Sequence, residues 1–224
     1  MADTDTDDRR LLATVAALGP RAPDSTLRPS PGVAYTDALR SLPRVVLAPD
    51  GETASPEGGE TLALHELLGE GGMGRVFAAT QRSLNRNVAV KLLDDDDPSR
   101  RAALLHEARI TGRLEHPNVA PVHVLGVDPA GSPVMVMKRI EGVSWRELQQ
   151  DPSHAAWSAL ESRHRDRLEA QLSVLLSVCD ALEYAHARGI VHRDVKPENV
   201  MLGPFGEVYP VSYTHLTLPT SDLV

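Results

Sequence analysis

The segment Gly69-Glu70-Gly71-Gly72-Met73-Gly74 has the composition of a loop that binds phosphate. Glycines spaced as Gly69-x-Gly71-x-x-Gly74 leave backbone N–H groups uncovered by side chains, and such groups bind anions. Three kinds of phosphate-binding loop share this spacing, and a plain glycine-rich hairpin can show it too. The spacing alone therefore indicates phosphate chemistry without identifying the kind of loop.

The residues after the glycines separate these alternatives. A dinucleotide-binding fingerprint needs a helix after the last glycine, whereas Val76 and Phe77 belong to a predicted strand. A P-loop needs Lys and then Ser or Thr after the last glycine, and Arg75 and Val76 occupy those positions. A glycine-rich flap between two antiparallel strands fits the strand–loop–strand pattern and places Val76 at that motif's valine.

Five predicted strands and one helix surround the glycines and form a small sheet lobe. Apolar runs predict strands over Leu62–Leu68, Arg75–Thr80, Val88–Leu93, Val122–Val127 and Val134–Met137. After the third strand, Asp97 and Pro98 have the types preferred at the cap and first position of a helix. Apolar residues at helical spacing follow, so we expect a helix that ends near Gly112.

The pattern becomes helical after Gly142. Ser144–Gln150 is predicted to be a short helix, and leucines between Leu168 and His186 recur at helical spacing. Gly189 is interpreted as the C-terminal cap of this long helix, and Val200–Leu202 as a short strand. Cys179 is interpreted as a core residue, because a free cysteine packs like a small apolar side chain.

Composition narrows the classes of partner. The chain has 23 Lys and Arg against 31 Asp and Glu, a net charge of −8, which argues against nucleic acid or an anionic membrane as partner. A single cysteine excludes an intrachain disulfide and a cysteine-rich zinc site, and favours a cytoplasmic location. We expect no membrane-spanning segment, because the most apolar long stretch is short and carries Asp180 and Glu183. The sequence indicates no oligomeric state.

Further motifs follow the glycines in a fixed order. Val88-Ala89-Val90-Lys91 comes after one hairpin, Glu107 lies on the next helix, and His192-Arg193-Asp194 is followed by Lys196 and Asn199. In these motifs the chain resembles the eukaryotic-like serine/threonine protein kinases, particularly their bacterial Hanks-type branch. The resemblance covers residues 62–209. It implies an α+β, bilobal protein-kinase-like fold, with a complete β-rich small lobe that includes helix C and the first part of a helical large lobe.

The resemblance also implies ATP and Mg²⁺ as cofactors and a protein Ser or Thr hydroxyl as substrate. Lys91 would hold the α- and β-phosphates, with Glu107 as its partner. Asp194 would orient the substrate hydroxyl and accept its proton, and Lys196 would neutralise the transferred group. Asn199 would bind Mg²⁺ through its amide oxygen. His192 is expected to be a packing residue.

A second set of residues would bind the nucleotide if the resemblance holds. Met137 matches the gatekeeper, and residues 138–140 match the hinge. Ala89 and Leu202 would enclose the adenine. The full nucleotide-binding set is Leu68, Gly69, Gly71, Gly72, Gly74, Val76, Ala89, Lys91, Met137, Ile140 and Leu202.

The end of the chain departs from the family pattern. Family kinases carry a second metal ligand, the Asp of Asp-Phe-Gly or Asp-Trp-Gly, where this chain has Ser212 and Tyr213, and no Asp-x-Gly follows Asn199. Residues 211–220 resemble a translated sequencing adapter. We interpret the chain as an N-terminal fragment that stops before this motif; a natural truncation or frameshift is the alternative.

The expected organisation is therefore a disordered leader over residues 1–60, a kinase small lobe over 61–141, a partial large lobe over 142–210 and a non-family tail over 211–224. Many prolines in the leader break any long periodic element. A non-catalytic nucleotide-binding pseudokinase or scaffold is the main alternative function. A small-molecule kinase of the same fold is a further one, which Lys196 and Pro197 disfavour.

Overall fold

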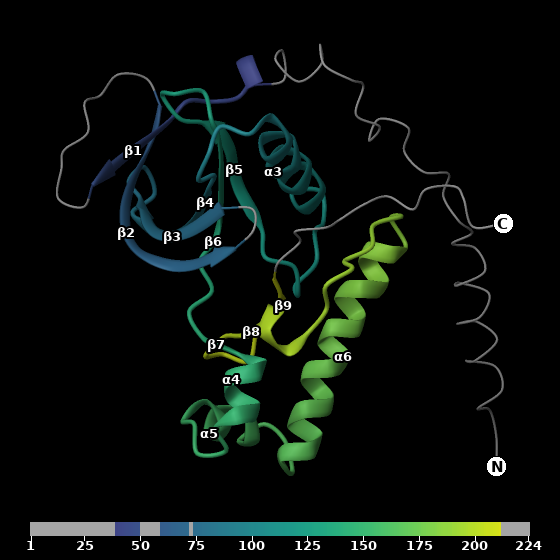
Figure 1. The fold of residues 1–224 in the computed structure, drawn as a ribbon. Helices are drawn as coiled ribbons and strands as arrows, with labels where there is room; N and C mark the ends of the chain where they lie inside the picture. The colour runs from purple at the N-terminus through teal and green to yellow at the C-terminus, as the bar shows by residue number, and fades with distance from the viewer. Residues whose placement is uncertain (1–38, 50–58, 72–73, 212–224) are drawn as a thin grey trace, which may run out of the picture.

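A computed structural model of the chain describes residues 39–49, 59–71 and 74–211 (Figure 1). Its larger sheet has six strands in the order β1-β2-β3-β4-β6-β5, and all neighbours are antiparallel except β1 and β2. The strands are β1 (Val45–Pro49), β2 (Glu60–Gly71), β3 (Gly74–Gln81), β4 (Arg86–Leu92), β5 (Val122–Val127) and β6 (Pro133–Lys138).

The two faces of this sheet carry different residues, because side chains alternate along a strand. One face forms a valine-rich core; its buried members are Val45, Leu62, Ala79, Val88, Val90, Val134 and Val136. On the other face, Met135 packs against Leu104 and Ala108 of helix α3 (Pro98–Thr111). The strand pattern thus fixes which side of the sheet the helix covers, and Figure 1 shows α3 beside that sheet.

Helix α3 begins and ends where the sequence predicts. The Asp97 side chain accepts a hydrogen bond from the Ser99 backbone N–H at 2.8 Å, and Pro98 occupies the first turn. Gly112 is the C-terminal cap, and its N–H donates to the Ala108 carbonyl. The predicted helix is confirmed.

The second part of the molecule is mainly helical and lies below the sheet in Figure 1. It contains α4 (Trp145–Gln150), α5 (Ala156–Glu161), α6 (Arg167–His186), the 3₁₀ turn η2 (Pro197–Asn199) and a small sheet of β7 (Val143–Ser144), β8 (Val200–Leu202) and β9 (Val208–Pro210). A core that includes Leu148, Trp157, Val174 and Leu202 joins these elements. Among the described residues, none of the helices combines the length and hydropathy that crossing a bilayer requires.

Helix α6 corrects the interpretation of Cys179, which is exposed rather than in the core. The buried face of this helix consists of small residues: Ala170, Val174, Val178, Ala181 and Ala185. Leu168, Leu172 and Leu175 lie on a face that is 45–66% exposed. Cys179 is one helical turn beyond Leu175, so it shares the exposed face. The large apolar leucines suggested that their face of α6 is buried, whereas the face with the small residues is the buried one.

The expected leader also needs a correction. Residues 45–49 form β1, a strand of the large sheet, and Val45 is completely buried in its core. The small lobe therefore begins before residue 61. Five residues are too few to show a periodic pattern. Pro43 precedes this strand and Pro49 is its last residue, so neither interrupts it. Residues 1–38 and 50–58 of the expected leader lie outside the described residues, as does the tail after Val211.

We predict that Leu104→Ala destabilises the 224-residue chain by about 2–5 kcal/mol, because the substitution leaves a cavity between α3 and the sheet. The measurement is urea unfolding. Leu168→Ala is the matched control: Leu168 is 66% exposed, so its loss should change the free energy of unfolding by less than about 0.5 kcal/mol. Equal effects of the two substitutions would contradict the assigned packing of α3.

Candidate active site

The glycine segment is a hairpin between two antiparallel strands. Gly69 pairs with Val76 and Gly71 with Gly74, so the last glycine opens strand β3 rather than a helix. This arrangement excludes the dinucleotide fingerprint and the P-loop, and it confirms the flap. Gly72, another predicted phosphate-binding residue, lies outside the described residues.

The glycines of this hairpin differ in their surroundings. Gly74 has φ +114°, and a Cβ there would collide with the Leu92 carbonyl of the neighbouring strand. A Cβ at Gly69 or at Gly71 would meet no described atom within 4 Å. The lobe itself therefore requires glycine at 74, whereas the other two glycines leave space above the sheet for a ligand.

Lys91 and Glu107 form a buried ion pair between β4 and α3. The Lys91 ammonium Nζ lies 2.9 Å from Glu107 Oε1 and 2.7 Å from Oε2, and both side chains are less than 10% exposed. A charge buried this deeply is tolerated only when it is paired. The structure thus brings together two predicted catalytic residues that are sixteen positions apart.

Register places several predicted nucleotide residues on the same face as Lys91. Val76 is the β3 partner of Lys91, and Met137 is the β6 partner of Ala89. Directly paired residues and residues two apart point to the same side of a sheet, so these four side chains share one face. The valines of the core occupy the opposite face.

The other predicted nucleotide residues lie in separate parts of the two lobes. Ile140 lies between β6 and β7, and Leu202 lies in β8, where it pairs with Val143. Leu68 lies in β2 just before the glycines and is 45% exposed. These three residues therefore come from three separate segments of the chain.

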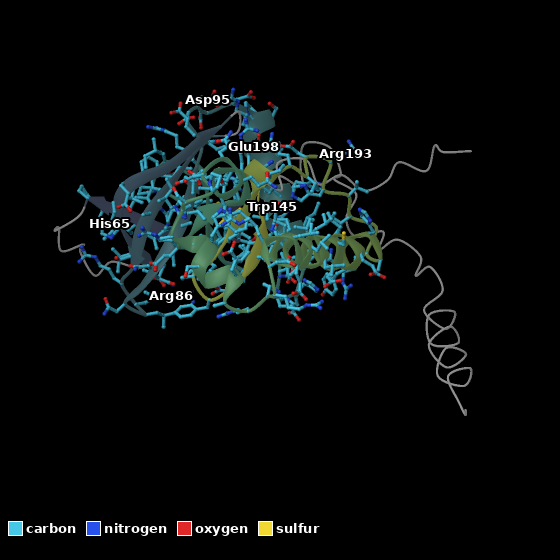
Figure 2. The ribbon with its side chains drawn as sticks, turned by 90° about the horizontal axis from the view of Figure 1, so that it is seen from below. His65, Arg86, Asp95, Trp145, Arg193 and Glu198 are labelled. Carbon is cyan, nitrogen blue, oxygen red and sulfur yellow. The ribbon has the colours of Figure 1, made fainter. Side chains whose placement is uncertain are left out.

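The loop before η2 brings the remaining predicted residues together. The Asn199 amide Nδ2 donates to the Asp194 carboxylate Oδ2 at 2.8 Å and to the Asp194 carbonyl at 3.0 Å. Lys196 Nζ lies 3.1 Å from the same carboxylate oxygen. Arg193, labelled in Figure 2, has the left-handed φ of +63°, a strained conformation for a residue other than glycine.

Comparison with known proteins agrees with this geometry. A family model described as "Protein kinase domain" matches residues 62–208. The chain belongs to the protein kinase domain family. The serine/threonine-protein kinase PknD of Chlamydia muridarum is 35% identical over 153 residues, and the probable serine/threonine-protein kinase PknB of Corynebacterium glutamicum is 38% identical over 151 residues. The matches cover 67% and 65% of this chain but only 16% and 22% of the relatives.

Membership of the family fits the α+β fold, with a sheet-rich small lobe above helices. The second metal ligand that kinase domains use is missing from its expected position in the sequence. Ser212, at the expected position of the second metal ligand, lies outside the described residues, and no Asp-x-Gly follows Asn199. Within the described part of the kinase domain, no group of three or more His, Cys, Asp or Glu side chains could hold a metal ion.

Asp194 is held as a carboxylate. The hydrogen bond from Lys196, followed by the one from Asn199, lowers the pKa of Asp194 below its usual value. An ionised carboxylate can accept a hydrogen bond from a hydroxyl, as the kinase reaction requires. His192 is 2% exposed, and burial lowers its pKa, so it is neutral at pH 7 and serves as the predicted packing residue.

Asn199 is oriented in a way that suits a metal ligand. Its amide nitrogen faces Asp194, so its amide oxygen is on the other side of the group. Amide oxygens are ligands that Mg²⁺ accepts. The residues present therefore fit the ion that the family uses, at one of its two usual ligand positions.

The sequence analysis did not identify the ion pairs of the acidic run at residues 94–97. Asp94 pairs with Arg75 of the hairpin, Asp95 with Arg100, and Asp96 with Arg101, while Asp97 caps α3. Figure 2 shows Asp95 at the outer rim of the small lobe. The arginines five residues after Asp95 and Asp96 are the signal that could have shown this pairing.

A second missed contact joins the hinge to the lower sheet. Lys138 Nζ donates to the Tyr209 hydroxyl at 2.6 Å and lies 4.6 Å from the centre of its ring. A cavity of about 510 Å³ adjoins both residues and is lined mainly by residues 111–122. Lys138 of the predicted hinge lines it, but none of the eleven predicted nucleotide-binding residues does.

We predict that the kinase domain loses stability below about pH 6.5. Below this pH the histidine at position 192 binds a proton in the unfolded chain, whereas in the folded protein burial lowers the pKa of His192 and opposes protonation. Unfolding therefore becomes easier as pH falls. His123 acts in the same direction, because burial lowers its pKa too. Urea midpoints at pH 7.5 and 5.5 measure the effect. His192→Phe should shrink the difference between them; an unchanged difference would contradict the assignment.

Proposed function

We propose that this chain is part of a serine/threonine protein kinase that transfers the γ-phosphoryl group of ATP to a Ser or Thr hydroxyl of a protein. The observation that carries the proposal is the pairing of Asp194 with both Lys196 and Asn199, on a loop that follows the lobe with the buried Lys91–Glu107 pair. Lysine two residues after the aspartate is typical of kinases that act on Ser and Thr. The curated relatives carry that name.

The small lobe would bind and position the nucleotide. Glu107 holds the Lys91 ammonium against the sheet face, where it can contact the α- and β-phosphates. The hairpin at Gly69 and Gly71 offers backbone N–H groups to the phosphates without side chains in the way. Ala89, Met137 and Leu202 supply apolar surface for the adenine. Since phosphoryl transfer depends on position and charge, these contacts are the main contribution of this lobe.

The loop of Asp194 would carry out the proton transfer. Its carboxylate would accept a hydrogen bond from the substrate hydroxyl and take the proton as the hydroxyl oxygen attacks the γ-phosphorus, while the bond to the β,γ-bridging oxygen breaks and ADP leaves. Lys196 neutralises charge on the transferred group. Asn199 would hold Mg²⁺ through its amide oxygen; when bound, this ion neutralises phosphate charge. Asn199 also fixes the orientation of Asp194 through its amide nitrogen.

The proposed setting is the cytoplasm, where ATP is available and a lone thiol stays reduced. The proposed large lobe begins at residue 142, and the end of the family match at residue 208 supports a limit of the family sequence near residue 210. Residues 211–224 are proposed not to belong to the kinase domain. The proposed partner is a protein that carries Ser or Thr.

Lys91→Met tests the proposal in a protein that joins residues 1–211 to a complete large lobe with an Asp-x-Gly motif. We expect transfer of labelled phosphate to a Ser/Thr protein to fall at least a hundredfold, because phosphate positioning is lost. The circular dichroism spectrum should be retained. Arg109→Met, an exposed change on α3, is the control and should leave transfer unchanged. Wild-type transfer by Lys91→Met would refute the role of Lys91.

A second prediction separates the kinase from a pseudokinase. The 224-residue chain should transfer no phosphate, because it has no Asp-x-Gly to bind the second metal position. The extended protein should transfer it. Robust transfer by the short chain would mean that another carboxylate serves the metal. ATP binding without transfer in the extended protein would favour the non-catalytic alternative.

A further inference from the structure

Strand β1 lies upstream of the region that matches the kinase family, which begins at residue 62. Its residues 45–49 pair in parallel with residues 60–64 of β2. At its start, the Glu60 backbone N–H donates to the Arg44 carbonyl at 3.1 Å. The segment therefore covers an edge of β2 that would otherwise present unpaired backbone groups.

The same segment reaches the opposite edge of the sheet. The Val127 N–H, at the end of β5, donates to the Pro43 carbonyl at 3.0 Å, and Arg44 and Val127 form an isolated parallel bridge. Because β5 is the last strand in the sheet order, residues 43–49 connect the first and last strands. In Figure 1 the purple segment runs along the upper end of the sheet before it enters β1. The small lobe is thus closed at this end.

Two glycines make room for the segment. A Cβ at Gly126 would collide with Val45 Cγ2 and would lie 2.7 Å from the Pro43 carbonyl oxygen. A Cβ at Gly59 would lie 2.8 Å from the Arg44 carbonyl oxygen. Real Cβ atoms do not approach other atoms this closely, so both positions must be glycine while the segment is in place. Gly126 lies inside the family match and accommodates residues outside it.

The side chains of β1 complete the core. Val45 is 0% exposed and packs in the same cluster as Leu62 and Val88, and Leu47 packs against that cluster. Val46 points to the other face and is not among the residues of this cluster. Val45 and Leu47 therefore anchor the strand in this core, whereas Val46 is only partly buried on the other face, which also carries the buried Ala48.

The position of β1 bears on the nucleotide site through β2. β1 holds the first half of β2, and two register shifts follow, between Leu64 and Leu67 and between Leu67 and Gly69. The second half of β2 then forms the glycine hairpin. We propose that residues 43–49 are a positioning strand of the kinase, which fixes β2 so that the hairpin lies over the phosphates of ATP. This inference rests on the proposed kinase function.

Val45→Ser and Val46→Ser are a matched pair of variants, since they make the same change on opposite faces of one strand. In the extended kinase, Val45→Ser should raise KM for ATP about fivefold or more and leave kcat within twofold. Val46→Ser should change neither constant. A fall in kcat with unchanged KM would indicate loss of folded enzyme rather than mispositioning, and would overturn the proposal.

Hydrogen exchange on the 224-residue chain tests the strand independently of catalysis. Val45→Ser should speed exchange of the β2 amides at residues 60–64, and Gly126→Val should do the same by pushing against Val45. Val46→Ser should not. If these amides respond as expected but the extended wild type transfers no phosphate, the strand stands and the proposed function fails. Wild-type exchange in both Val45→Ser and Gly126→Val would overturn the role of β1.

Discussion

The buried ion pair of Lys91 and Glu107 is the constraint on which the rest of the small lobe depends. Each charge has lost most of its water, and only the other charge compensates for that loss. The pair forms only if α3 is placed along the sheet, and turned about its own axis, so that Glu107 faces Lys91. Leu104 and Ala108 fix that placement by packing on Met135, so an apolar contact controls an electrostatic one.

The lower part of the site is built differently. Asp194, Lys196 and Asn199 lie within six residues of chain, and one strained residue and one short 3₁₀ turn are enough to bring them together. Their geometry is therefore mostly local. The geometry of the small lobe depends on contacts between segments that are distant in the sequence. There, α3 must pack correctly on the sheet before Lys91 and Glu107 can pair.

This difference explains what could be predicted from the sequence. The loop motif, the glycine hairpin and the pairing of Lys91 with Glu107 follow from residue order and a family resemblance, and the structure brings those residues together. Strand β1 was not predicted, because only its pairing with β2 and its packing in the valine-rich core show that Val45 is a core residue. Cys179 was assigned to the core in error, because helical spacing shows which residues share a face but not whether another element covers that face.

The glycines of the hairpin record two separate demands on the sequence. At Gly74 the Leu92 carbonyl of the lobe excludes a side chain, so the packing of the two strands favours glycine there whether or not a ligand binds. At Gly69 and Gly71 no described atom excludes one. A descendant that stopped using nucleotide could therefore exchange Gly69 and Gly71 and still keep Gly74. In such a lineage, replacement of Gly69 and Gly71 while Gly74 is retained would indicate that ligand binding was lost before the fold.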